Sequence, residues 1–310
     1  MKIYKPKFWN TKNSIFSIIL MPFTAMLVVI TYFKKKFTFT SRFRIPVICV
    51  GNIYIGGTGK TPMSIYIAQE LSGVGKKPVI IRKFYKNHSD EHNLINAHYA
   101  NLILCKNRVN GITEAESRKF DSVILDDGFQ DHSIKKNLSI ICFNQSQLIG
   151  NGLIIPSGPL RESLNSLKKA QIIIINGKKS FEFEEKILRI NNNLEIYYTK
   201  YKPTNIDELK NKELLAIAGI GNPNNFFDLL SNNNLSIKKK LVFPDHYNFK
   251  KSEFKKIIKE AEENNYQIIM TEKDYYKVKN FNFKNIMYLK LKLEIENSNN
   301  LMERISKLYV

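Results

Sequence analysis

The sequence predicts an α/β protein with a doubly wound, mostly parallel sheet and a second, smaller α/β domain. Three observations support this class. Short apolar, β-branched runs alternate with helical patterns, a glycine-rich turn follows the first run, and strand–helix–strand order resumes after the Asn-rich stretch 191–193. At 310 residues the chain is long enough for one large or two medium domains with their own cores.

The first expected element is an apolar helix between two basic clusters. Residues 14–33 are 20 uncharged and mainly apolar residues, enough helix to cross the ~30 Å hydrocarbon layer of a bilayer. Pro22 and several hydroxyl residues interrupt the run. We predict that residues 1–40 form a basic, membrane-anchoring segment with a membrane-associated helix that spans the bilayer or lies in its interface. A buried core helix is the alternative. The flanking lysines are Lys2, Lys5, Lys7, Lys12, Lys34, Lys35 and Lys36.

The charge predicts an anionic neighbour. The formal net charge is +20, and the first acidic residue is Glu70, after ten Lys or Arg. An anionic membrane surface and nucleic acid both satisfy such a charge. Because the basic clusters flank an apolar segment and no base-stacking module is evident, we expect the membrane surface as a partner and no nucleic acid.

A glycine-rich loop follows the apolar run 45–50 and leads into a helical pattern at 63–71. Glycines let backbone N–H groups wrap around phosphate oxygens, and a Lys-Thr pair at the helix start contacts the outer phosphates and magnesium. Tyr54 stands where such loops usually have their first glycine. A glycine-rich turn with a solvated lysine is the alternative. The residues expected at the nucleotide are Gly56, Gly57, Thr58, Gly59, Lys60 and Thr61.

The remaining strands of a P-loop NTPase-like domain, expected over 41–192, are apolar runs at 78–81, 101–104, 122–125, 138–141 and 172–175. Ligands of open α/β sheets bind at the carboxyl ends of the strands. Asp126 and Asp127 directly follow the run 122–125 and are therefore candidate magnesium ligands. An Asp-Asp-Gly turn without a metal is the competing interpretation.

A second α/β domain is expected over 193–310. Its predicted elements are a strand at 214–218, a helix at 226–230, an amphipathic helix at 254–261 and a strand at 266–270. Two polar clusters carry further chemistry. His88 to His92 is a metal cluster or a solvated loop, and the histidine of Pro244 to Tyr247 is structural or functional. Cys49, Cys105 and Cys142 have no paired spacing and are expected in the core.

The ordered blocks of this sequence resemble the tetraacyldisaccharide 4'-kinase family of the lipid A pathway, from about residue 10 to about residue 275. The matching blocks are Gly51 to Pro62, Asp90-Glu91, Asp126 to Gln130, Pro156 to Glu162, Ala218 to Pro223, Phe243 to Tyr247 and Thr271 to Asp274. The family often has Ser-Arg-Gly-Tyr-Gly where this chain has 81–86, so the loop geometry there departs from the pattern.

The resemblance implies a kinase that uses ATP and Mg²⁺. The enzyme would transfer the γ-phosphate to the 4'-hydroxyl of an acylated glucosamine disaccharide 1-phosphate and form lipid IVA at the cytoplasmic face of the inner membrane. It implies that Asp90 is the catalytic base and that His246 works with it. Since the two lie in different expected domains, catalysis would require domain closure. A monomer is expected.

The resemblance also implies the remaining site residues. Thr61, Glu91, Asp126 and Asp127 form the candidate magnesium shell. Gln130 is expected to orient a water at the cofactor, and Arg161 to neutralise phosphate charge. From a different functional class, a membrane-anchored P-loop nucleotide switch without a lipid substrate is the alternative, and such a switch would not need Asp90 and His246.

Overall fold

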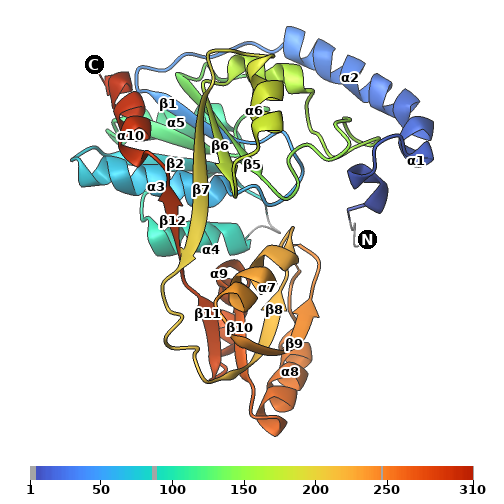
Figure 1. Ribbon diagram of the computed structural model, residues 1–310. Coiled ribbons are helices and arrows are strands. Elements are labelled where there is room, and N and C mark those ends of the chain that lie inside the picture. The colour runs from blue at the N-terminus through green and yellow to red at the C-terminus, as the bar shows by residue number, and fades with distance from the viewer. Residues whose placement is uncertain (1–4, 86–88, 246, 310) are drawn as a thin grey trace. The chain divides into compact units, whose positions relative to one another are not determined.

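The computed structural model describes residues 5–85, 89–245 and 247–309 (Figure 1). They form two compact units. The larger unit contains Lys5–Phe84, Tyr99–Lys200 and 293–309, and the smaller contains Tyr85–His98 and Tyr201–Lys292. This division differs from the expected ranges 41–192 and 193–310, because 85–98 joins the smaller unit and the C-terminal residues return to the larger one.

The larger unit is built on an eight-stranded sheet in the order β12-β7-β6-β5-β1-β4-β2-β3. The pairs from β7 to β3 are all parallel. All residues of β1 and β5 are buried, which is why these strands are continuous apolar runs rather than alternating ones. The strands are β1 (Val47–Gly51), β2 (Pro78–Lys83), β3 (Leu102–Cys105), β4 (Ser122–Asp126), β5 (Leu138–Asn144), β6 (Ile172–Asn176), β7 (Glu195–Pro203) and β12 (Leu291–Ile295).

The strand order places β1 at a topological switch point. Outward from β1, the neighbouring strands are β5, β6 and β7 on one side and β4, β2 and β3 on the other. In such sheets the crevice at the carboxyl end of the switch strand receives the ligand. The doubly wound, mostly parallel sheet is thus confirmed. Its helices are α3 (Lys60–Gly73), α5 (Arg108–Ser117), α6 (Phe181–Leu188) and α10 (Ser298–Ser306), with 3-10 helices η1 (Lys7–Asn10), η2 (Leu164–Lys169) and η4 (Lys307–Tyr309).

The N-terminal apolar segment forms two helices, α1 (Ile15–Ile19) and α2 (Met21–Lys36), which follow one another near the top right of Figure 1. No residue of α2 is buried, so the interpretation as a core helix is wrong. Thr24 contacts the rest of the larger unit, and its hydroxyl lies 2.8 Å from that of Ser157. Within the described part of the chain, no helix combines the length and apolarity that a bilayer crossing requires.

The smaller unit has a four-stranded parallel sheet in the order β11-β10-β8-β9. Alternate residues of β8 face two clusters: Leu214 and Ala216 pack with Phe226 of α7, whereas Leu215 and Ile217 pack with Phe254 of α8. The expected second α/β domain is thus present. Its elements are α4 (Ser89–His98), β8 (Glu213–Ala218), α7 (Pro223–Asn232), β9 (Ser236–Val242), α8 (Lys251–Glu263), β10 (Gln267–Thr271), α9 (Glu272–Val278), η3 (Lys279–Phe281) and β11 (Ile286–Leu289).

The three cysteines are free thiols, as expected. Cys49 and Cys142 are buried, and Cys105 is half-buried. Burial raises the pKa of Cys49 to about 11 and that of Cys142 to about 12. Both thiols therefore stay protonated near neutral pH and act as apolar core residues.

Candidate active site

The glycine-rich loop connects the end of β1 to the first residue of α3. Gly59 precedes the helix with a φ of 89°, and Gly56 has a φ of 111°. Residues that carry a side chain rarely adopt such positive φ angles, so glycine is required at both positions. Lys60 and Thr61 are consequently the first two residues of α3, where free backbone N–H groups and the helix dipole favour an anion.

Two side chains brace this loop from inside. Buried Asn52 donates from Nδ2 to the carbonyl oxygen of Tyr54 at 2.6 Å and to the hydroxyl of Thr58 at 2.9 Å. Gln130 in turn donates from Nε2 to the carbonyl oxygen of Asn52 at 2.8 Å. Tyr54 is buried, with 2% of its surface exposed, so the residue in the usual glycine position packs into the core.

Lys60 lies beside Asp127, with 3.7 Å between Nζ and Oδ1. Burial lowers the pKa of Lys60, and the charge of Asp127 opposes that shift. Burial alone would raise the pKa of Asp127, but the positive charges nearby, above all those of Lys60 and Arg161, hold this pKa well below its usual range. Asp127 is therefore ionised near neutral pH.

Asp126 is fully buried at the end of β4 and receives several donors. The hydroxyl of Thr61 donates to Oδ2 at 3.1 Å, and the hydroxyl of Ser64 donates to Oδ1 at 3.2 Å. Arg82, at the end of β2, forms an ion pair with the same carboxylate. The structure thus brings Thr61 and Asp126 together at the start of α3, as the sequence predicts.

Arg161 reaches the same place from the segment that follows Pro159. Its backbone N–H donates to the carbonyl oxygen of Ile53 at 2.7 Å, which fixes the segment along the loop. Its guanidinium donates to Asp127 Oδ1 at 2.8 Å and to Gln130 Oε1 at 3.4 Å. Arg108 of α5 adds a bond to the carbonyl oxygen of Asp127 at 2.7 Å.

This charge arrangement fits a polyphosphate with a divalent cation. Four cations, Lys60, Arg82, Arg108 and Arg161, act on Asp127, and three carboxylates pair with them: Asp126, Asp127 and, at Arg108, Asp131. The surplus of positive charge suits phosphate oxygens. Thr61 and Asp126 place hard oxygen atoms side by side, which are the ligands that Mg²⁺ prefers.

The other candidate magnesium ligand, Glu91, lies in the smaller unit with Asp90. No group of three or more His, Cys, Asp or Glu arranged for a metal occurs among residues 5–85, 89–245 and 247–309. A magnesium site in the larger unit would therefore rest on Asp126, Asp127 and the Thr61 hydroxyl.

Asp90 occupies the first turn of α4, so the interpretation of His88 to His92 as a solvated loop is wrong for the described residues 89–92. Its surface is 2% exposed. Asp90 belongs to the same compact unit as Asp245, rather than to the unit of the glycine-rich loop. His246 lies outside the described residues, and its role stays a prediction.

Several charged residues at these places were not singled out from the sequence. Arg82 and Arg108 come from β2 and α5, and their pairing depends on the strand order, which no local pattern reveals. Lys273 and Lys277 of α9 contact Asp90 at 3.6 and 3.4 Å. The block Thr271 to Asp274 was the one available signal for them.

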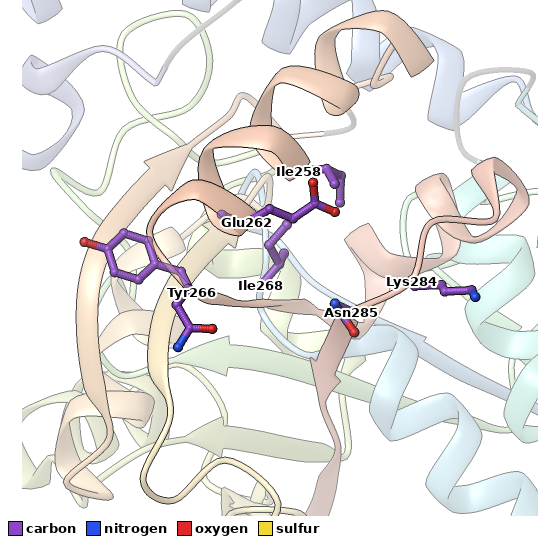
Figure 2. A pocket seen from close by; sticks show the side chains of 8 residues that line it. Ile258, Glu262, Tyr266, Ile268, Lys284 and Asn285 are labelled. Atoms are coloured by element: carbon purple, nitrogen blue, oxygen red, sulfur yellow. The ribbon is translucent and has the colours of Figure 1, made fainter.

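A hollow elsewhere in the smaller unit has a volume of about 210 Å³ (Figure 2). Side chains at the end of α8 and before β11 line it, among them Glu262, Tyr266 and Lys284. It is smaller than the ~300–1,000 Å³ of typical ligand pockets and holds none of the expected site residues.

A glycine-rich turn at the switch point, a lysine at the first position of the next helix and a strand-end aspartate against its threonine define a P-loop nucleotide-binding protein. The chain matches the family model "Tetraacyldisaccharide-1-P 4'-kinase" over residues 16–309. The chain therefore belongs to the tetraacyldisaccharide-1-P 4'-kinase family.

Similar proteins agree with this assignment. Tetraacyldisaccharide 4'-kinase of Pelagibacter ubique is 45% identical, with 99% of each chain covered. The protein of the same name from Rickettsia canadensis is 33% identical, covering 99% of this chain and 98% of the relative. The crystal structure of LpxK from Aquifex aeolicus in complex with ATP has the same fold, with a TM-score of 0.73 at 23% identity, covering 95% of this chain and 99% of that one.

Proposed function

We propose that this chain transfers the γ-phosphoryl group of ATP to the 4'-hydroxyl of a tetraacylated glucosamine disaccharide 1-phosphate, which yields lipid IVA. Membership of the family supports the substrate and the reaction. The observation that carries the proposal is the pairing of Lys60 and Thr61 with Asp127 and Asp126 at the switch point of the sheet. Membership of a kinase family argues against the alternative of a nucleotide switch without a lipid acceptor.

In the proposed reaction the loop and its cations hold the triphosphate. Lys60 and Arg161 neutralise charge on the phosphate oxygens, and Gln130 keeps the loop and Arg161 in place. Magnesium, when bound, spreads this neutralisation over the transferred group, and Thr61, Asp126, Asp127 and Glu91 are the proposed oxygen ligands.

Asp90 is the proposed base. A sugar hydroxyl is a weak nucleophile, so a carboxylate that accepts its proton assists attack. The bond between the 4'-oxygen and the γ-phosphorus forms, the bond from that phosphorus to the β–γ bridging oxygen breaks, and ADP leaves. His246 is proposed to orient Asp90. Because the loop and Asp90 belong to different compact units, the reaction needs residues from both.

The proposed location is the cytoplasmic face of the inner membrane. An acylated substrate stays in the bilayer, so the enzyme must work at that surface. The apolar side chains of α1 and α2 are widely exposed, for example Phe16 at 62% and Phe23 at 57%, and Lys34 to Lys36 end α2. Apolar helices with lysines at one end are typical of interfacial anchors.

The test measures phosphate transfer from ATP to the purified disaccharide 1-phosphate by the mass of the product. Asp90→Asn and Lys60→Met are each expected to lower kcat/KM by about 10²–10⁴-fold. Lys178→Met, at an exposed site, is the control and should leave turnover unchanged. Near-normal transfer by Asp90→Asn would remove Asp90 as the base, and ATP hydrolysis without any lipid product would favour the switch.

A further inference from the structure

The N-terminus of α9 is fixed by a fully buried carboxylate. Asp274 Oδ2 accepts from the backbone N–H of Gly219 at 2.6 Å and from the hydroxyl of Thr271 at 2.7 Å, and its own N–H donates to that hydroxyl at 3.2 Å. Thr271 is thus the N-cap of α9, its hydroxyl accepting from the N–H of Asp274 and donating to the Asp274 carboxylate. It makes the start of α9 a rigid point of the smaller unit.

Lys277 connects this fixed point to Asp90. Its Nζ lies 2.7 Å from Asp274 Oδ1 and 3.4 Å from Asp90 Oδ2. Its side chain is only 5% exposed, and that of Asp90 only 2%. A buried ammonium between two buried carboxylates has little freedom, so it fixes where the oxygen atoms of Asp90 point.

Lys273 lies one turn earlier on the same face of α9 and contacts two separate segments. Its Nζ is 3.6 Å from Asp90 Oδ2 and 3.4 Å from Glu91 Oε1, both in the first turn of α4. It also lies 3.0 Å from Asp245 Oδ1, in the loop after β9. Asp245 directly precedes His246 in the chain.

Stability alone gives a poor account of this arrangement. Two ammonium groups face four carboxylates, and taking such charges out of water offsets much of the attraction between them. The network instead orients the Asp90 carboxylate. Lys277 links it to Asp274 at the start of α9, and Lys273 links it to Asp245 in the loop after β9.

We propose that Lys273 and Lys277 are positioning residues for phosphoryl transfer. Lys277 holds the carboxylate of Asp90 against the Asp274 anchor, and Lys273 ties the start of α4 to the loop that leads into His246. This inference rests on the proposed role of Asp90 as the base. It concerns the placement of the base and leaves nucleotide binding by the larger unit unchanged.

The test uses the full chain with ATP, Mg²⁺ and the tetraacyldisaccharide 1-phosphate. Lys273→Met and Lys277→Met are expected to lower kcat by about 10- to 100-fold, the range that loss of orientation produces. KM for ATP should stay within about threefold of the parent in Lys277→Met, since Lys60, the loop and Glu91 are untouched. Lys273→Arg, which keeps the charge, should recover part of kcat, and Lys256→Met, at an exposed site on α8, should be unchanged.

A double-mutant cycle tests the link to Asp245. If Lys273 acts through Asp245, then Asp245→Asn combined with Lys273→Met lowers kcat no further than the stronger single variant. Multiplicative losses would overturn that link. Thermal unfolding of each variant accompanies the kinetics, and if Lys277→Met does not fold, the more exposed Lys273 decides the test.

The outcomes separate the two proposals. If Asp90→Asn is inactive while Lys273→Met and Lys277→Met keep kcat within twofold, the positioning role is wrong and the proposed function stands. If Asp90→Asn keeps its turnover, the proposed base is wrong whatever the lysine variants do. An equal rise of KM for ATP in all the Met variants would indicate general misfolding and overturn the positioning role.

Discussion

Asp127 illustrates how much of the site a local pattern can predict. Its place after an apolar run marks it as a strand-end carboxylate, and the structure brings it to 3.7 Å from Lys60. The positions of Gly59, Lys60 and Thr61 could be predicted in the same way, because the three are consecutive residues at the start of one helix. The guanidinium of Arg108 was not predictable, because α5 reaches Asp127 only through the order of the strands.

His98 and Glu272 provide a test of the charge pairing within the smaller unit. Nε2 of His98 lies 2.8 Å from Glu272 Oε1, and this hydrogen bond raises the pKa of His98, although burial opposes the shift. The pair is partly exposed, so its contribution is about 0.2–1 kcal/mol.

The folded pKa of His98 lies above the ~6.5 of an unfolded chain, so the stabilisation is complete below that pH and is lost as the pH rises through the folded pKa. Urea unfolding should therefore show a larger difference between the parent and His98→Gln at pH 5.5 than at pH 8.5. His132→Gln should change in the opposite direction: burial and nearby lysines lower the pKa of His132 to about 4, so His132 destabilises the folded parent near pH 5.5, and its replacement should be more favourable at pH 5.5 than at pH 8.5. A difference that grows with pH for His98→Gln would contradict the pairing.

Among the elements, long amphipathic helices were predictable and short polar ones were not. The apolar positions Phe254, Ile257 and Ala261 of α8 are buried as the helical period predicts. By contrast, α4 has few apolar residues, Ile95 being a buried one, and its first turn is all polar. Its helical form depends on packing within the smaller unit, which no window of sequence displays.

The Thr271 N-cap of α9 makes a prediction at this scale. Thr271→Ala removes the hydroxyl that accepts from the N–H of Asp274 and donates to its carboxylate. The expected loss is about 1 kcal/mol in the free energy of unfolding, measured in urea. Thr271→Ser keeps the hydroxyl and should stay close to the parent. Equal stability of the Ala and Ser variants would show that the cap contributes nothing.

At the scale of the whole molecule, the net charge of +20 and the exposed helix α2 predict binding to anionic membranes. Each lysine near such a surface contributes about 1 kcal/mol. Replacing Lys34, Lys35 and Lys36 by glutamine should therefore weaken binding to vesicles that contain an anionic phospholipid by about 10²-fold, and added salt should weaken binding by the parent.

The matched control changes the same charge elsewhere. Lys250, Lys255 and Lys256 are exposed at the start of α8, and their replacement by glutamine should reduce vesicle binding much less. Flotation of both triple variants with the vesicles measures the difference. Equal losses would mean that net charge alone, rather than the end of α2, controls the attachment.

The domain boundaries were the least predictable feature at this scale. Composition marks the change near residues 191–193, but the sequence has no signal that 85–98 joins the smaller unit, since contacts between α4 and α9 are long-range. The return of the chain through β12 is equally hidden, because the pairing of β12 with β7 joins segments that are far apart in the sequence.

That return through β12 affects how the protein is made. The larger unit begins at Lys5, yet Leu301 and Ile305 of α10 are buried in it, and the Tyr309 hydroxyl lies 2.6 Å from that of Ser122. The sheet of the larger unit therefore gains its edge strand β12 and the helix α10 only after residues 291–306 have been synthesised. β11 of the smaller unit ends at Leu289, only a few residues before β12, so we expect the two sheets to be completed at nearly the same stage of synthesis.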